Sequence, residues 1–304
     1  MRKVKVKIPA STTNLGCGFD CLGLALTCYN VVEMELIEEK GVFIRVEGEG
    51  ENFIPKDTKN IIFPALEEIF KKIGKKPSGI KITEINHIPI GKGLGSSAAT
   101  RLGGIVAASH LLDVNLSYKE ILKIATKLEG HPDNVAASLL GGFVAVVNNG
   151  KDLLWIKLDI PENLKVVVVV PELQILTEKA RKILPLKVSL SDAVFNLSRV
   201  ALLVPSLTQG VWNNLQVAMQ DKLHQPYRAS LLPGMEDVFK AAFLAGAKGA
   251  FLSGAGSSIA AFTLEKEEDV GKAMKEAFSK NGIRSKVMIL SVDREGVRVD
   301  EKKQ

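Results

Sequence analysis

A glycine-rich stretch, "PIGKGLGSSAAT" at residues 89–100, constrains this chain more than any other feature, because it connects a predicted strand to a predicted helix. We call residues 89–95 the glycine loop. It is not a Walker A loop, since Gly91-Lys92 is followed by Gly93, and it lacks the G-x-G-x-x-G spacing of a dinucleotide site. A helix that begins near Ser96 would direct unpaired amides and its positive dipole end at an anion. We expect a phosphate site or, as the plainer alternative, a turn with a serine cap.

Two further glycine segments accompany this loop. They read "PASTTNLGCGFDCLGLAL" at residues 9–26 and "LSGAGSSIAAF" at residues 252–262, and each follows a predicted strand. Three such segments with serines or threonines beside them indicate loops that converge on a polar ligand. Taken alone, Gly256 would only indicate a tight turn between two strands.

Composition restricts the partners. The chain has 304 residues, 46% hydrophobic and 24% charged, which is typical of a soluble globular protein. The net charge of +6 is spread over Lys-Glu segments, so we expect a solvated surface and no nucleic-acid partner. The N-terminus lacks a signal region and no apolar run is long enough to span a bilayer, which predicts a cytoplasmic protein without a membrane partner. Cys17, Cys21 and Cys28 are interpreted as reduced packing residues.

Apolar periodicity gives the order of elements. It predicts strands over residues 4–8, 29–36, 42–46, 80–85, 143–147, 153–157, 166–170, 249–253, 259–263 and 285–292, and helices over 60–73, 97–112, 117–127, 133–140, 178–183, 192–203, 211–219, 234–245 and 266–280. Strand-helix alternation mixed with hairpins favours an α+β fold over a doubly wound parallel sheet. A boundary near residues 150–165 divides the chain into domains 1–160 and 161–304.

The three glycine segments, in this order and spacing, resemble the three motifs of the GHMP kinases, and the resemblance covers essentially the whole chain. It implies an N-terminal domain of the ribosomal-protein-S5-like type and a C-terminal ferredoxin-like α/β sandwich. It also implies that the glycine loop holds the phosphates of ATP without a Walker lysine.

Within that superfamily, residues 9–26 and "LEGHPDN" at residues 128–134 resemble the homoserine kinases. "TEKARKILP" and "QPYRASLLPG" resemble the segments in which that family supplies substrate-binding arginines, here Arg181 and Arg228. The resemblance implies ATP-dependent phosphorylation of the side-chain hydroxyl of L-homoserine to O-phospho-L-homoserine in threonine biosynthesis. A homodimer is common among such relatives.

The resemblance also implies a set of site residues. For the nucleotide these are Asn60, which would read the adenine edge, and Pro89, Ile90, Gly91, Lys92, Gly93, Leu94, Gly95, Ser96, Ser97, Ala98 and Ala99. Ser97 and Glu129 would hold Mg²⁺, whose preferred ligands are hard oxygens. Substrate contacts are implied for Asn14, Asp20, His131, Arg181, Arg228 and Gly254, and catalytic roles for Ser97, Asp133 and Asn134.

The chemistry of a zwitterionic substrate agrees with these assignments. A carboxylate suits two guanidinium groups, Arg181 and Arg228, and an ammonium suits Asp20 and Asn14. Either Asp133 or Asn134 faces the hydroxyl; in this family an asparagine that orients the hydroxyl is thought to make a general base dispensable. Lys92 is discounted as a phosphate ligand, and Arg101 and Arg199 are interpreted as surface ion pairs.

Two alternatives remain open. Another GHMP kinase, such as a mevalonate kinase, could use the arginine pair for any carboxylate, but mevalonate has no amine for Asp20. A non-catalytic ligand sensor on the same scaffold is the second alternative, because a fold does not determine a function. Such a sensor would have lost Ser96, Ser97 or Glu129, and this chain keeps all three.

Overall fold

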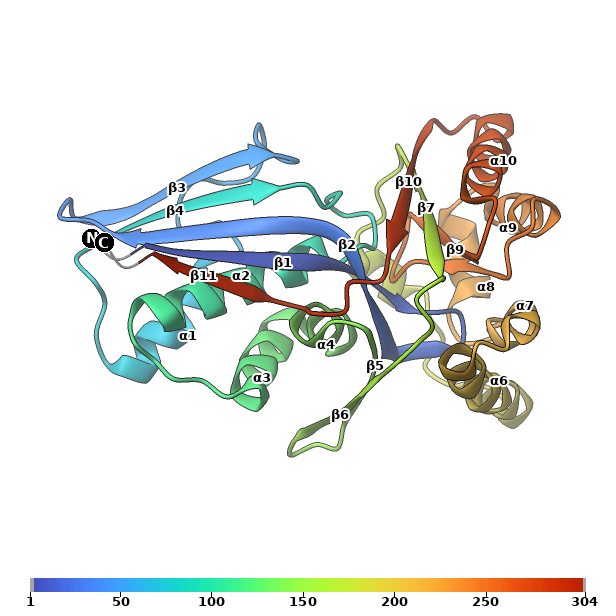
Figure 1. Cartoon of the computed structure of the whole chain (residues 1–304), viewed down its shortest axis with the longest axis horizontal. Coiled ribbons are helices and arrows are strands. Elements are labelled where there is room, and N and C mark those ends of the chain that lie inside the picture. The colour runs from blue at the N-terminus through green and yellow to red at the C-terminus, as the bar shows by residue number, and fades with distance from the viewer. Residues whose placement is uncertain (1–2, 303–304) are drawn as a thin grey trace.

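The computed structural model describes residues 3–302 as two β-sheets that are each covered by helices (Figure 1). The first sheet has the path β11-β1-β2-β4-β3, and β5 and β6 extend it from one end of β2. Its strands are β1 (Lys3–Asn14), β2 (Gly18–Leu36), β3 (Gly41–Gly48), β4 (Gly79–Asn86), β5 (Phe143–Asn148), β6 (Leu153–Leu158) and β11 (Arg298–Lys302).

The second sheet has the order β10-β7-β9-β8, and all of its pairs are antiparallel. Its strands are β7 (Lys165–Pro171), β8 (Gly249–Leu252), β9 (Ile259–Thr263) and β10 (Ser285–Ser291). Numbered along the chain, this order is 4-1-3-2, with helices after the first and third strands, which is the ferredoxin-like arrangement. The prediction of an α+β fold of this type is confirmed.

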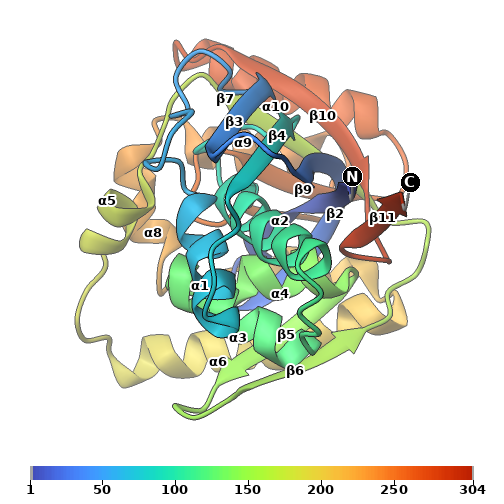
Figure 2. The same cartoon turned by 90° about the vertical axis from the view of Figure 1, so that its left-hand side faces the viewer.

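Four helices cover one face of the first sheet (Figures 1 and 2). They are α1 (Phe63–Ile73), α2 (Ser96–Leu111), α3 (Tyr118–Glu129) and α4 (Asp133–Leu140). Helix α2 is apolar and buried on nearly all sides, and a Cβ at Gly103 would lie 2.6 Å from the Val32 side chain. Because α2 packs this closely on the sheet, its N-terminus, which follows the glycine loop, has a fixed position.

The helices of the second half vary more in length. They are α5 (Thr177–Lys182), α6 (Leu190–Gln209), η1 (Trp212–Asn214), α7 (Leu215–Ala218), α8 (Gln225–Arg228), η2 (Ala229–Leu231), α9 (Met235–Leu244) and α10 (Glu267–Lys280). Helices α9 and α10 cover the second sheet (Figure 1). In the described part of the chain only α6 is long and apolar enough to cross a bilayer, which is weak evidence because helices of soluble proteins also meet these criteria.

Several predicted elements differ from the structure. Residues 9–26 are paired strands with a turn at Leu15–Cys17, whereas the prediction ended the first strand at residue 8. Ser11–Thr13 are all polar, so the sequence lacks the alternation of polar and apolar residues that identifies a strand. Their side chains are buried, and those of Ser11 and Thr12 form hydrogen bonds to other segments. Helix α1 begins three residues late because Pro64 occupies its first turn. The helix predicted over 211–219 is two short pieces, and α8 and β11 were not predicted.

The chain passes from the first sheet to the second between β6 and β7, and β11 returns to the first sheet. Strand β11 pairs with β1, in a register that places Val6 opposite Val299. Residues 298–302 therefore belong to the first sheet, although the predicted C-terminal domain includes them, and the division into 1–160 and 161–304 stays a prediction. The pairing covers β1, which would otherwise be an exposed edge strand.

Candidate active site

The three glycine segments meet at one place. The Ser11 N–H donates to the Leu94 carbonyl at 3.1 Å, which joins β1 to the glycine loop. From the third segment, the Ser253 hydroxyl donates to the Gly93 carbonyl at 2.6 Å and the Ser258 N–H to the Lys92 carbonyl at 3.1 Å. The predicted convergence is therefore present in the structure.

Close packing explains the glycines of the loop. Gly93 and Gly95 have φ values of +76° and +73°. Added Cβ atoms would lie 2.0 Å from the Ser253 carbonyl oxygen and 2.2 Å from the Ser11 hydroxyl oxygen. Helix α2 begins at Ser96 with Gly95 as its N-cap, and no side chain caps it, so the serine-cap alternative is wrong. The uncapped first turn presents backbone N–H groups to an anion.

Several other residues of the glycine loop and of the start of α2 have side chains that pack within the protein or bond to it. The Lys92 ammonium donates to the carbonyls of Pro171 and Leu173 at 2.8 and 2.9 Å, which ties the loop to the end of β7, and burial lowers the pKa of Lys92. The side chains of Leu94, Ala98 and Ala99 are buried, so these residues can face a nucleotide only through their main chain. Pro89 and Ile90 line a cavity of about 280 Å³ beside β7 and β10.

Asn60 forms several hydrogen bonds within the protein. Its side chain is 1% exposed, and its amide donates to the Pro55 carbonyl at 2.9 Å and to a Glu84 carboxylate oxygen at 2.8 Å. Its oxygen accepts the Ile62 N–H at 2.9 Å. Because both N–H bonds are used inside the protein, the side chain supports the start of α1, and its contact with the adenine edge stays a prediction.

Ser97 and Glu129, the predicted metal ligands, lie together at the N-terminus of α2. The Ser97 hydroxyl donates to Glu129 Oε2 at 2.9 Å. Arg101 forms an ion pair with the same carboxylate oxygen and also donates to the Ser97 hydroxyl. The Arg101 and Glu129 side chains are only 21% and 11% exposed, so the interpretation of Arg101 as a surface ion pair is wrong.

These groups fit a magnesium ion that shares its ligands with phosphates. A carboxylate and a hydroxyl are hard oxygen ligands, and Mg²⁺ commonly takes one or two protein ligands together with substrate phosphates and water. Residues 3–302 contain no group of three or more His, Cys, Asp or Glu side chains that could hold a metal without such help.

A small cavity of about 30 Å³ lies beside the glycine segments. It is lined by Thr13, Asn14, Asp20, His131, Asp133, Asn134, Thr177, Arg181, Arg228, Gly254 and Ala255. The structure thus brings together every residue that was predicted to contact the substrate. Asn14 connects two glycine segments, because its amide donates to the Gly254 carbonyl at 3.0 Å and its oxygen accepts the Asp20 N–H at 3.0 Å.

Arg228 is a buried cation without a carboxylate partner among residues 3–302. Its side chain is 2% exposed and donates to the carbonyls of Gly254 at 3.0 Å and Ala180 at 3.2 Å, and to His224 Nδ1 at 3.2 Å. Burial lowers its pKa to about 10, so it stays protonated at neutral pH. Burial also lowers the pKa of His224 to about 4, and the neutral ring donates from Nε2 to the Gly16 carbonyl. An uncompensated buried charge at a cavity marks an anion site.

Two residues that the sequence left without a role support Arg228. The Phe19 ring stacks on His224 with a centroid distance of 5.1 Å. The guanidinium carbons of Arg228 and Arg181 lie 5.2 and 5.7 Å from the centre of the same ring. The aromatic face therefore stabilises both cations. A single phenylalanine or histidine has no spacing signal, and only its place in "GCGFDC" draws attention to Phe19.

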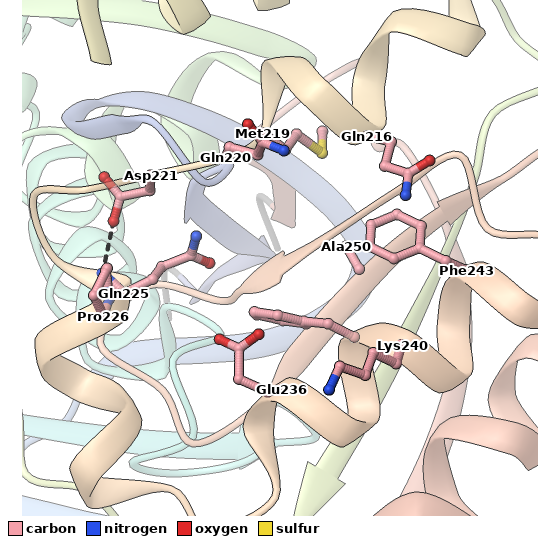
Figure 3. Close-up of a pocket in the computed structure, with 11 residues that line it drawn as sticks. Gln216, Met219, Gln220, Asp221, Gln225, Pro226, Glu236, Lys240, Phe243 and Ala250 are labelled. Atoms are coloured by element: carbon pink, nitrogen blue, oxygen red, sulfur yellow. Dashed lines mark hydrogen bonds between the residues drawn. The ribbon is translucent and has the colours of Figure 1, made fainter. Parts of the chain in front are cut away.

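Helix α8, which carries Arg228, is anchored at its start. The Asp221 carboxylate accepts the N–H groups of Leu223, His224 and Gln225, the last of which is drawn in Figure 3. The Gln225 side chain accepts the Leu252 N–H of β8 at 2.7 Å. A cavity of about 310 Å³ lies along this anchor (Figure 3). The short helix therefore has a fixed position that determines where the guanidinium lies.

Asp133 and Asn134 begin α4 and differ in their partners. Asp133 Oδ1 accepts His131 Nδ1–H at 2.6 Å and the Asn134 N–H at 2.9 Å. Burial would raise the pKa of Asp133, but the hydrogen bonds from His131, the Asn134 N–H and Thr13 outweigh it and hold the pKa below its usual value. Asn134 accepts the Ser11 hydroxyl at 2.9 Å, and its Oδ1 would lie 3.0 Å from a Cβ at Gly95. Asn134 therefore lies between the glycine loop and the cavity.

Comparisons with known proteins agree with this geometry. The family models for the GHMP kinases N-terminal domain and the GHMP kinases C-terminal region match residues 60–142 and 203–283, which defines the class of protein as a GHMP kinase. Kinases of this superfamily use ATP. Homoserine kinase from Caldicellulosiruptor saccharolyticus is 44% identical, over 97% of this chain and 96% of that protein.

Solved structures give the same assignment. A crystal structure of homoserine kinase from Cytophaga hutchinsonii has a TM-score of 0.89 and 36% identity, over 98% of this chain and 97% of that one. A mevalonate kinase structure, 18% identical with a TM-score of 0.72, shares the fold alone. The chain therefore belongs to the homoserine kinase family.

Proposed function

We propose that this protein transfers the γ-phosphoryl group of Mg²⁺-ATP to the side-chain hydroxyl of L-homoserine and forms O-phospho-L-homoserine for threonine biosynthesis. The observation that carries the substrate assignment is the buried Arg228 guanidinium, which has no carboxylate partner at the cavity. A cytoplasmic location fits this use of ATP.

The cavity offers complementary groups for both ends of an amino acid. Arg228 and Arg181 bind the carboxylate, because planar guanidinium groups match its geometry. Asp20 and the Asn14 amide oxygen accept the ammonium. The Gly254 carbonyl, which already bonds Asn14 and Arg228, fixes these two residues relative to one another. A ligand with only one of these charges leaves the opposite group without a partner.

The phosphate side of the site provides charge stabilisation. The backbone N–H groups of the glycine loop and of the first turn of α2 hold the phosphates of ATP. Ser97 and Glu129 would hold Mg²⁺, which would supply positive charge to offset the charge of the phosphates. Phosphoryl transfer depends chiefly on such positioning and electrostatics.

Asn134 orients the acceptor hydroxyl, and Asp133 keeps His131 in place. A general base works best with a pKa near the operating pH, whereas the pKa of Asp133 is held below its usual value. The hydroxyl oxygen forms the new bond to the γ-phosphorus as the bond to the β-γ bridging oxygen breaks. The hydroxyl proton passes to a phosphoryl oxygen and then to solvent.

The test is ADP release with Mg²⁺-ATP and L-homoserine, D-homoserine, mevalonate, shikimate or galactose as acceptor. We expect a strong preference for L-homoserine that is lost in Arg228→Met. A preference for mevalonate would overturn the ammonium site. Nucleotide binding without turnover of any acceptor would favour the sensor alternative.

A further inference from the structure

Arg101 lies one helical turn after Ser97 on α2, and its side chain turns back toward the N-terminus of the helix. Its Nη1 donates to the Ser97 hydroxyl at 2.9 Å and pairs with Glu129 Oε2, the atom that also accepts the Ser97 hydroxyl proton. Arg101 thus holds both proposed metal ligands at once. Its Nε and Nη2 have no hydrogen-bond partner within residues 3–302, so most of its donors remain free.

A guanidinium and a divalent cation cannot share this position. Both seek the same carboxylate oxygen, and two cations a few ångströms apart repel each other. If Glu129 and Ser97 bind a metal ion, Arg101 therefore loses its hydrogen-bond acceptors. The guanidinium lies beside Ser97 in the first turn of α2, so phosphates bound at that turn would be the nearest replacement acceptors. Arginine matches phosphate oxygens well.

We propose that Arg101 is a positioning residue which occupies the cation position between Ser97 and Glu129 in the nucleotide-free enzyme and moves to the phosphates when ATP and its metal bind. This inference rests on the nucleotide and Mg²⁺ assignments proposed above. It predicts two effects of removing the guanidinium. ATP without metal binds more weakly, because the guanidinium between Ser97 and Glu129 no longer offsets the negative charge of Glu129 beside the phosphates. Less Mg²⁺ is needed to saturate the site, because the metal no longer has to displace a cation.

The experiment measures the dissociation constant of ATP in EDTA, and the Mg²⁺ concentration that half-saturates the effect of metal on nucleotide binding. It compares the wild type with Arg101→Gln, Arg101→Lys and Arg45→Gln. Arg45 is the matched control because it forms an exposed ion pair with Glu47 on β3. We expect Arg101→Gln to weaken ATP binding in EDTA about tenfold and to lower the half-saturating Mg²⁺ concentration. Arg101→Lys should keep part of the ATP affinity, because it keeps the charge.

If Arg101→Gln and Arg45→Gln have the same ATP affinity in EDTA and the same half-saturating Mg²⁺ concentration, the proposal is overturned. The ion pair of Arg101 with Glu129 would then serve only the fold. An equal loss of ATP affinity in Arg101→Lys and Arg101→Gln would also overturn the proposal, because the positive charge at residue 101 would then make no difference to ATP binding. If Arg101→Gln does not fold, Arg101→Met replaces it as the uncharged variant, and an unchanged Mg²⁺ requirement in Arg101→Met decides against the proposal. Failure of the wild type to bind ATP with or without Mg²⁺ would instead contradict the proposed function.

Discussion

The Asp20 carboxylate and the Arg181 guanidinium form two parallel hydrogen bonds of 2.8 and 2.9 Å in the lining of the cavity to which we assign the amino acid. The two residues are separated by 161 positions in the sequence. They are also the groups that we assign to opposite ends of the substrate. In this structure the two groups are each other's partners, and the cavity of about 30 Å³ beside them has room for little more than a water molecule.

This relationship predicts how specificity for a zwitterion arises. The ammonium of L-homoserine would pair with Asp20 and its carboxylate with Arg181, so both side chains keep a charged partner. 4-Hydroxybutanoate lacks the ammonium and would leave Asp20 unpaired. We expect Asp20→Asn to lower kcat/KM for L-homoserine by roughly tenfold or more. The ratio of kcat/KM for L-homoserine to kcat/KM for 4-hydroxybutanoate should fall as well. Steady-state kinetics with both acceptors measure this, and Glu47→Gln on the exposed part of β3 is the control. An unchanged ratio between the acceptors would contradict the assignment of Asp20.

Arg228→Met should separate stability from substrate binding. Removal of a charge-assisted contact should raise KM for L-homoserine roughly 10- to 100-fold, without a change in ATP affinity. The same substitution removes an uncompensated buried charge, so the free enzyme should melt at an equal or higher temperature. Arg45→Met, at the exposed arginine of β3 that pairs with Glu47, is the control for both measurements. A large loss of stability with KM unchanged would show that Arg228 serves only the fold.

Asn134 and Asp133 should respond differently to substitution. Asn134→Ala should lower kcat, because the acceptor hydroxyl loses its orienting group, while Asp133→Asn should retain part of the activity. Single-turnover measurements of phosphoryl transfer distinguish these effects from substrate binding. Complete loss of transfer in Asp133→Asn, with the fold and homoserine binding intact, would make Asp133 the general base.

The glycine loop offers a matched pair of substitutions. Gly95 and Gly74 both have left-handed backbones, with φ of +73° and +67°, but a Cβ at Gly95 would lie 2.2 Å from the Ser11 hydroxyl oxygen, and one at Gly74 would meet nothing within 4 Å. Gly74→Ala should therefore cost only about 1–2 kcal/mol of backbone strain. Gly95→Ala should cost more and weaken ATP binding. Chemical denaturation and nucleotide titration test this, and equal effects would mean that the loop accommodates a side chain.

Buried Glu84 predicts a pH dependence of stability. Burial raises the pKa of Glu84 well above its usual range, to about 7, so the folded state binds the proton more tightly than the unfolded chain. The free energy of unfolding should therefore fall as pH rises from the usual pKa of a glutamate to above about 7, by about 3 kcal/mol from Glu84 alone. Glu84→Gln should remove this slope and stabilise the protein at pH 8. Denaturation at pH 5 and pH 8 decides, and a slope that persists in Glu84→Gln would assign it to other groups.

Features of the fold that depend on short-range patterns were predictable. The glycine loop and the start of α2 followed from the glycine spacing and the apolar run behind it. The capping box of α3, in which Ser117 and Glu120 bond each other's backbone, is likewise a local sequence signal. The α+β class followed from the order of these local elements.

The sequence by itself determined where the backbone can bind an anion and which residue types lie near it, because backbone conformation depends on near neighbours. Only the tertiary structure decided the partners of the side chains. Asp20 meets Arg181, Arg101 meets Glu129, His224 and Phe19 support Arg228, and β11 returns to β1. Each of these contacts is fixed by packing between elements. Whether a charged side chain faces solvent, another side chain or a ligand depends on that packing, and residue spacing does not encode it.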